Sequence, residues 1–416
     1  MRKLWIAGAL MLLMFVSILL TQSTLAASLI REYRVPTADS NPNALTLGPD
    51  GNIWFTEKGG NKIGVVTPQG VFHEYSNGLT PDANLGGIAT GLDGNLWFAE
   101  LDGFSIGTIT PQGAITEYSG VLSPYLITPG PDGNMWFTDN GANAIGKITP
   151  LGEITEYQVP TWDAAVYDIT TGPDGNLWFT EQFASQIGKI TPDGVITEYS
   201  DGLTLGSQPL TIRTGPDGNI WFTETAAGRI GKITTGGKIT EYWKGLSAGS
   251  NPVGIAAGPD GAVWFTDPDK NRIGRITTSG KITEFTAPTG NSQPNDIHSD
   301  LKGDIWFTEW NGNRVAVRTL CQGTLSAPSA LGPMSKASLA QPGAVLFWTA
   351  GLCANSYTIV IRKDSKTGAV FLRKNNIKNL MFQTPDLPLH HTYFWQVSAC
   401  KGTTCRNSAW NTFVIP

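Results

Sequence analysis

The sequence predicts an all-β protein, a seven-bladed β-propeller closed by an N-terminal strand and followed by a small β-sandwich. Three observations predict this fold. A Trp-Phe pair recurs every 39 to 43 residues, each interval holds four strand-like segments separated by turn residues, and the repeat is absent from the last quarter of the chain. Repeats of about 40 residues with four short strands each are typical of propeller blades. The seven copies centre on Trp54, Trp97, Trp136, Trp178, Trp221, Trp264 and Trp306.

The first 26 residues are expected to be a secretory signal peptide. Arg2 and Lys3 precede the apolar run 4–20, and small residues end at Ala26. An uncleaved membrane anchor is the alternative, because the run is close to the shortest that spans a bilayer. No Cys stands near the cleavage point and the C-terminus has no apolar tail. The sequence therefore predicts an exported bacterial protein that is extracellular, with no lipid anchor, C-terminal anchor or membrane span after cleavage.

Each repeat of the predicted propeller, residues 29–320, spells the same series of motifs. An inner strand such as PVGIAAG leads into the turn PDG, the strand NIWFTE, a strand like KIGKIT and an outer strand like VITEYS. Pro fixes the first corner of the turn, and Gly accepts the positive φ that ends it. The neighbouring apolar residues of IWF imply strands buried on both faces, as expected for a blade between two others.

The outer-strand motif, Glu followed by Tyr or Phe, occurs after each of the first six copies but not after Trp306. Its seventh copy stands at the other end of the repeat region, in Arg31-Glu32-Tyr33. We therefore expect the N-terminal strand to complete the last blade, which closes the ring without an exposed edge.

From Ala327 onward, the segments GAVLFWTA, NSYTIVIRK, GAVFLRK and TYFWQVSAC indicate successive strands of one β-sandwich. With Trp348, Tyr357, Trp395 and Trp410, residues 332–416 resemble a fibronectin type III domain. Residues 321–331, rich in Ser, Ala, Gly and Pro, are expected to be a linker.

The four cysteines all lie in this last part of the chain, and outside the cytosol they are expected to pair. Four cysteines allow three connectivities. The favoured one joins Cys400 to Cys405 across a short loop and leaves Cys321 with Cys353.

Charge excludes two classes of partner. Loss of Arg2 and Lys3 with the signal peptide changes the formal net charge from −5 to −7. A mildly acidic chain without a basic patch is a poor partner for nucleic acids or anionic membranes.

Two sets of residues are expected at one mouth of the central channel, where loops of a propeller gather. The first is an acid after each Trp strand, and its presence in every repeat favours a structural acceptor for backbone N–H groups over a ring that binds a cation or polyol. These acids are Glu57, Glu100, Asp139, Glu181, Glu224, Asp267 and Glu309.

The second set stands near the start of the inner strands, where the repeats differ. Its polar and aromatic members are candidates for ligand binding, and a water-filled channel is the alternative. The set is Asn43, Gly86, Tyr125, Tyr167, Leu210, Val253 and Asn295, with Asn43, Tyr125, Tyr167 and Asn295 as the ligand-binding candidates.

The repeated PDGNIWFTE, NKIG and ITEY motifs, from Arg31 to about Leu320, resemble the virginiamycin B lyase (streptogramin lyase) family. The resemblance implies a Mg²⁺-dependent carbon–oxygen lyase that opens cyclic depsipeptide antibiotics by β-elimination. It also implies a catalytic His directly after the Pro that opens each of the last two inner strands. A Glu before the final Pro and a Glu at the end of the last Trp strand complete the implied set.

The chain departs from this pattern. Val253 and Asn295 stand at the two His positions, Gln293 replaces the Glu before the final Pro, and Glu309 alone can answer the last Glu. Neither Val nor an amide acts as a base near neutral pH. Of the remaining histidines, His298 is nearest the channel, but it should lie deeper along its strand.

We therefore expect a secreted binding or interaction protein, most simply a monomer, that retains the lyase scaffold without its histidines. Its partner would be a small molecule, a peptide or a surface polymer at the channel mouth, with no metal site. The alternative is a Mg²⁺-dependent lyase with a rearranged site, for which Gln293, Asn295 and Glu309 are the catalytic candidates. Convergence of His298 and Glu309 would favour that alternative.

Overall fold

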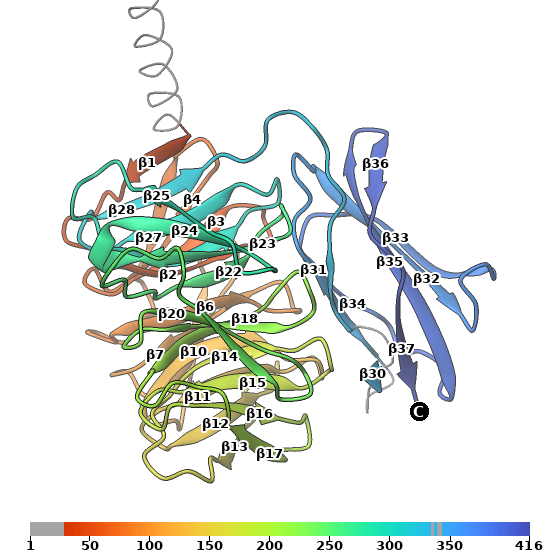
Figure 1. The fold of residues 1–416 in the computed structure, drawn as a ribbon, viewed down its shortest axis with the longest axis horizontal. Coiled ribbons are helices and arrows are strands. Elements are labelled where there is room, and N and C mark those ends of the chain that lie inside the picture. The colour runs from red at the N-terminus through yellow and green to blue at the C-terminus, as the bar shows by residue number, and fades with distance from the viewer. Residues whose placement is uncertain (1–28, 334–336, 339–342) are drawn as a thin grey trace, which may run out of the picture.

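The computed structural model describes residues 29–333, 337–338 and 343–416. The expected signal peptide lies outside these residues and stays a prediction. The described chain is almost entirely β, with one short 3-10 helix, η1 (Pro268–Lys270). Among these residues, no helix is both long and apolar enough to cross a bilayer. Figure 1 shows a ring of sheets with a smaller C-terminal body beside it.

Between Ile30 and Arg318 the chain forms seven four-stranded antiparallel sheets, which confirms the all-β propeller class. Each sheet runs from an inner strand to a Trp strand. The inner strands are β2 (Pro42–Leu47), β6 (Leu85–Thr90), β10 (Pro124–Pro129), β14 (Val166–Thr171), β18 (Pro209–Thr214), β22 (Ile255–Ala257) and β26 (Pro294–Ser299). The Trp strands are β3 (Ile53–Glu57), β7 (Leu96–Glu100), β11 (Met135–Asp139), β15 (Leu177–Glu181), β19 (Ile220–Glu224), β23 (Ala262–Asp267) and β27 (Ile305–Glu309).

A third strand and an outer strand complete each sheet. The third strands are β4 (Lys62–Val66), β8 (Ser105–Ile109), β12 (Ala144–Ile148), β16 (Gln186–Ile190), β20 (Arg229–Ile233), β24 (Arg272–Thr277) and β28 (Arg314–Arg318). The outer strands are β5 (Phe72–Tyr75), β9 (Ile115–Ser119), β13 (Ile154–Gln158), β17 (Ile196–Tyr199), β21 (Ile239–Tyr242), β25 (Ile282–Thr286) and β1 (Ile30–Arg34).

The apolar residues of the Trp strands fill the spaces between neighbouring sheets. Trp54 belongs to one core cluster with Phe98 of the next sheet, whereas Phe55 shares another with Trp306 of the preceding sheet. The Trp54 indole stacks on Tyr75 with ring centroids 5.6 Å apart and donates to Asp50 of the PDG turn at 3.1 Å. The same motif therefore contributes buried side chains to the interfaces with both neighbouring sheets, and it also stabilises its own PDG turn.

The N-terminal strand completes the last sheet, as predicted from the missing outer-strand motif. β1 pairs antiparallel with β28, with Glu32 opposite Ala316. Glu32 also accepts hydrogen bonds from the backbone N–H of Thr289 at 2.7 Å and from its hydroxyl at 2.6 Å. The first and last parts of the repeat region are therefore joined in one sheet.

The C-terminal residues form two sheets around one shared apolar core that includes Trp348, Tyr357 and Trp395. β29 begins two residues before the predicted boundary at 332, because the end of the expected linker pairs with β31. One sheet contains β29 (Ala330–Gly332), β31 (Val345–Trp348) and β34 (Met381–Gln383). The other contains β30 (Ala337–Ser338), β37 (Asn411–Ile415), β35 (His391–Lys401), β32 (Ser356–Lys363), β33 (Val370–Ile377) and β36 (Thr404–Asn407).

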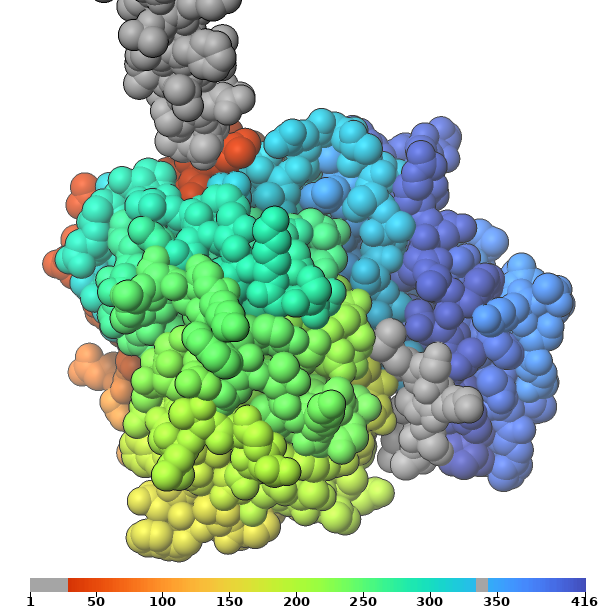
Figure 2. All heavy atoms as spheres, in the orientation of Figure 1, coloured from red at the N-terminus to blue at the C-terminus, as the bar shows by residue number. Residues whose placement is uncertain are grey.

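Both predicted disulfides are present, Cys321–Cys353 and Cys400–Cys405. The first lies where the two parts of the chain meet. The backbone N–H of Cys353 donates to the carbonyl of Lys302 at 2.7 Å, and that of Cys321 to Asp304 at 2.9 Å. Lys302 and Asp304 belong to the turn between β26 and β27, so the sandwich contacts the turn end of the propeller (Figure 2).

Candidate functional site

The acids that end the Trp strands are all fully buried. Asp139 has the structural role expected from its recurrence, since its carboxylate accepts backbone N–H groups from Leu122 at 2.7 Å, Ser123 at 2.9 Å and Ala142 at 3.0 Å. Asp267 likewise accepts the N–H of Asn251 at 3.1 Å. These two acids hold loops at the mouth end of the channel and do not face a ligand.

Four of the glutamates at this position do not have the expected role. Within the described residues, neither carboxyl oxygen of any of them has a hydrogen-bond partner. The glutamate side chain is one methylene group longer than that of aspartate and extends past the loop N–H groups. In Glu57, the Oε1 atom instead lies over Gly64 of the third strand, 2.7 Å from the position that a Cβ atom on this glycine would occupy. The four are Glu57, Glu100, Glu181 and Glu224.

Burial raises the pKa of these glutamates, to about 8 for Glu181 and about 9 for Glu224. The neighbouring outer-strand carboxylate, Glu198 or Glu241, raises each pKa further. The groups are therefore largely protonated near neutral pH and closed off from the channel, so they form no anionic ring there.

The four ligand-binding candidates come together around a small cavity of about 30 Å³ in the channel. They meet in two pairs. Tyr167 donates its hydroxyl to that of Tyr125 at 3.1 Å, with ring centroids 4.5 Å apart. Asn295 donates from Nδ2 to Oδ1 of Asn43 at 2.9 Å. The cavity is thus framed by phenol and amide groups, and Arg213 and Asp296 also line it.

Lys58 and Trp310 complete this mouth, and sequence reasoning missed both. The Lys58 Nζ atom lies 5.9 Å from the ring centroids of both Tyr125 and Trp310, so its charge rests on two aromatic faces. Burial lowers the pKa of Lys58. Each residue directly follows a strand-end acid, Glu57 or Glu309. Comparing the repeats at that next position, where they differ, would have found both.

The positions that the family resemblance implies as catalytic do not form an acid–base set. Glu309 is buried and accepts a hydrogen bond from the Ser292 hydroxyl at 2.7 Å, and burial raises its pKa to about 7. The backbone carbonyl of Gln293 accepts from the N–H of Trp310 at 3.0 Å. Val253 lines the mouth cavity and offers no polar atom from its side chain.

His298 and Glu309 do not converge. Pro294 pairs with Glu309 while His298 pairs with Trp306, three residues farther along β27. That separation is about 10 Å at 3.3 Å per residue. The His298 Nδ1 donates to the carbonyl of Ser299 at 2.8 Å, and burial lowers the pKa of the ring to about 4. His298 therefore faces the turn end of the channel.

Deeper in the channel lie three charged residues that the sequence analysis did not single out. The Asp168 carboxylate accepts the backbone N–H of Ile212 at 2.8 Å and pairs with the Arg213 guanidinium. Asp296 accepts the N–H of Leu45 at 2.8 Å. The sequence does contain a signal that could have identified these residues, because each is a charged residue inside an otherwise apolar inner strand.

The mouth residues do not fit the Mg²⁺ ion that the family resemblance implies. Mg²⁺ in proteins is held by carboxylates and water in octahedral geometry. The oxygens at the mouth cavity belong to amide, phenol and hydroxyl groups and to one carboxylate, Asp296. Both oxygens of Asp296 already accept backbone N–H groups, and Glu309 points to Ser292. In the described ranges, no three His, Cys, Asp or Glu residues are grouped as a metal site would require.

Large apolar side chains are exposed on the loops of the mouth end. Five such side chains are between 55 and 97% exposed, and they come from four consecutive sheets. Each lies in a loop that either follows a Trp strand or precedes an inner strand. Exposed apolar groups gathered on one face mark sites of interaction. They are Phe104, Leu122, Trp162, Phe183 and Leu205.

Comparison with known proteins agrees with this architecture. Residues 21–202 and 121–328 match the family model described as the virginiamycin B lyase family. A stretch of 39 residues is 49% identical to virginiamycin B lyase of Bacillus licheniformis, covering 9% of this chain but only 13% of that protein.

Solved structures match over a longer span. The crystal structure of virginiamycin B lyase from Staphylococcus aureus has a TM-score of 0.66 and 35% identity, over 69% of this chain and 98% of that one. A catalytically inactive His-to-Ala form of the Staphylococcus aureus lyase, crystallised with quinupristin, matches with 34% identity and the same TM-score and coverage. The chain described here belongs to the virginiamycin B lyase family.

Proposed function

We propose that this protein is a secreted binding protein that uses the channel mouth of the family scaffold without the elimination reaction. The observation that carries the proposal is the replacement of both implied bases. Val253 cannot take a proton, and the Asn295 amide is held by Asn43 at 2.9 Å. β-Elimination needs a base within reach of the acidic C–H proton, and His298 lies about three strand residues below the mouth.

The mouth favours a peptide with apolar side chains. Paired phenols and amides offer hydrogen bonds to backbone amides of a ligand, while Trp162, Phe183 and Leu205 offer exposed apolar surface around them. Aromatic and apolar anchors supply most of the binding energy in peptide recognition. The two disulfides agree with a protein that works outside the cytosol.

The test uses a streptogramin B antibiotic, a cyclic depsipeptide, with Mg²⁺ and the mature chain. Ring opening is followed by reversed-phase chromatography, since elimination leaves the mass unchanged, and binding is followed by calorimetry. We expect binding without turnover. Turnover above the rate of the antibiotic alone would overturn the binding-only proposal, and absence of both would overturn the proposed ligand class.

Substitution of the exposed apolar residues locates the binding. The double variant Trp162→Ser/Leu205→Ser should weaken binding about tenfold, because two exposed anchors are lost. Leu151→Ser is the matched control, since Leu151 is 86% exposed but lies in the turn between β12 and β13, at the opposite end. An equal loss of affinity in the double variant and in the control variant would show that the ligand binds elsewhere.

The alternative, a residual lyase, is tested by restoring the family residues. The triple variant Val253→His, Gln293→Glu and Asn295→His supplies the implied bases and acid at the mouth. Activity gained by this variant but absent from the natural chain would support loss of an ancestral site.

A further inference from the structure

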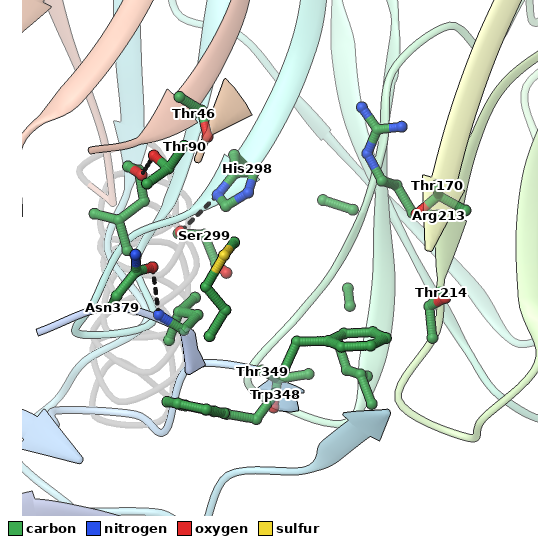
Figure 3. Close-up of a pocket in the computed structure, with 17 residues that line it drawn as sticks. Thr46, Thr90, Thr170, Arg213, Thr214, His298, Ser299, Trp348, Thr349 and Asn379 are labelled. Atoms are coloured by element: carbon green, nitrogen blue, oxygen red, sulfur yellow. Dashed lines mark hydrogen bonds between the residues drawn. The ribbon is translucent and has the colours of Figure 1, made fainter. Parts of the chain in front are cut away.

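At the turn end the channel opens against the sandwich, whose side chains line the space together with those of the propeller. Two adjoining cavities of about 160 and 170 Å³ lie there and share much of their lining. The inner strands contribute Thr46, Thr170, Arg213 and His298, and the sandwich contributes Phe347 and Met381. Figure 3 shows His298 and Arg213 on opposite sides of the open space, with the sandwich side chains beneath them.

The polar side of this interdomain cavity offers both acceptors and donors. His298 is neutral near pH 7, since burial lowers its pKa to about 4, and its Nδ1 proton is given to Ser299. The lone pair on Nε2 is therefore an acceptor, and among the described residues nothing donates to it. The hydroxyls of Thr46 and Thr170 line the same space, and within the described residues neither has a hydrogen-bond partner.

The charge of the cavity disfavours an anion. Arg213 uses Nη1 to bind Asp168 and the carbonyl of Ile212, and the rest of its guanidinium lines the cavity as a donor. Because Asp168 and Asp296 are both near Arg213, its positive charge is already offset. An anionic ligand would meet two carboxyl groups with no unpaired cation.

The opposite side of the cavity is mainly apolar. Phe347, Trp348 and Met381 face the inner strands, and Leu331 extends the apolar surface, while Thr349 and Asn379 add two polar side chains. An engineered apolar cavity of about 150 Å³ is known to hold benzene, so each of these two cavities is large enough for one aromatic ring. A thioether beside aromatic side chains also packs well on a flat ring.

We propose that the interdomain cavity is a second binding site, at the other end of the channel from the mouth, with Arg213 lining both cavities. It takes an uncharged molecule the size of one substituted aromatic ring, with a hydrogen-bond donor and an acceptor on the same end, such as a primary amide. The donor faces His298 Nε2, the acceptor faces Arg213, and the ring lies against Phe347 and Met381. The appended sandwich is then part of a ligand site and not only a spacer.

Benzamide is the probe, and benzoate, its charged counterpart without a donor, is the matched control ligand. Binding to the mature chain is measured by the saturable rise in Tm and by protein-detected NMR. We expect benzamide to bind at least tenfold more tightly than benzoate. Binding of benzoate equal to or tighter than that of benzamide, or no saturable binding of benzamide, would overturn the proposal.

Two variants locate the site. Met381→Trp fills the cavity from the sandwich side and should abolish binding, and His298→Leu removes the acceptor and should weaken binding at least tenfold. Tyr125→Phe, at the mouth, should leave it unchanged. Unchanged binding in Met381→Trp would overturn the proposal even if His298→Leu does not fold. Electron density for benzamide in a soaked crystal, between Phe347 and His298 or elsewhere, decides the same question independently.

Discussion

The carboxyl groups that end the Trp strands differ in what they contact, although the sequence places them at one repeated position. Asp139 is short enough to accept three backbone N–H groups, whereas Glu181 reaches past the loop and has no hydrogen-bond donor among the described residues. A buried carboxyl group without donors is more stable protonated. One methylene group therefore separates an acid that accepts the N–H groups of its loop, Asp139, from one that is buried without a donor, Glu181.

The first prediction concerns Glu181, which faces Glu198. Its pKa is near 8 in the fold against 4.5 when exposed, so the folded state binds the proton more tightly. Stability from this group is greatest at low pH and decreases as pH rises from about 4.5 to about 8. Glu181→Gln should raise Tm at pH 8 and flatten the dependence of Tm on pH between 5 and 8, measured by calorimetry.

The matched control is Asp139→Asn. Here the substitution removes a carboxyl group that accepts three backbone N–H groups, so Tm should fall at pH 8 by an amount equivalent to about 1–3 kcal/mol. A rise in both variants, or a fall in both, would contradict the distinction between the two acids.

Residue identity predicted the mouth only in part. Asn43, Tyr125, Tyr167 and Asn295 were found because the repeats differ there, and the structure places them around one cavity. Their role in binding stays a prediction. Lys58 was missed because the repeats were not compared at the position after the strand-end acid. Its contacts with Tyr125 and Trp310 join three different sheets, and they became visible only in the structure.

At the scale of the strands, one glycine explains how the sheets pack. Gly188 in β16 lies opposite Phe179 in β15, and a Cβ on it would stand 2.1 Å from the Phe179 ring. The third strand of six of the seven sheets has Gly at this place, and the seventh has Ala316. The aromatic ring of the Trp strand thus covers the third strand only where that strand has little or no side chain.

We accordingly expect Gly188→Ala to lower stability by about 1–3 kcal/mol or more, because a buried ring must move. Chemical denaturation measures the change. Gly290→Ala is the control, since nothing lies within 4 Å of a Cβ placed there. Equal stability of the two variants would contradict the packing argument.

The strand that closes the ring gives a further prediction. Glu32→Ala in β1 removes the acceptor for two hydrogen bonds from Thr289 and the partner of Arg314 at 3.6 Å. We expect a loss of about 1–3 kcal/mol, read from the unfolding midpoint in urea. Arg31→Ala, a neighbouring exposed position, should change it little. A large effect of Arg31→Ala alone would place the anchor of β1 elsewhere.

For the whole molecule, the repeat made the propeller predictable, and nothing in the sequence made the docking of the sandwich predictable. Because one motif is repeated seven times, the spacing of the strands, the turns between them and the buried faces could be predicted by comparing its copies. The contact of Tyr357 with the carbonyl of Leu301, at 3.0 Å, joins two unlike surfaces and has no counterpart elsewhere in the chain. Hence the interdomain cavity and the role of His298 in lining it followed only from the structure.

The two disulfides should differ in effect. Cys321–Cys353 spans 32 residues and lies beside the propeller, whereas Cys400–Cys405 spans 5 within one hairpin. The loop-entropy relation gives about 3.7 and about 2 kcal/mol respectively. Replacing Cys321 and Cys353 by Ser should therefore lower Tm more than replacing the other pair. The reverse order would show that the first disulfide does not restrain the contact between the two parts.

Pairing of β1 with β28 also sets an order of events during synthesis. The sheet they share cannot form until Arg318 has left the ribosome, because its outer strand is made first and its third strand last. Six sheets can assemble earlier, but the ring stays open and β1 has no partner strand until β28 has been made. The ring therefore cannot close until nearly the whole propeller has been synthesised. The closing step joins β1, the first strand of the propeller to be made, to β28, the last one.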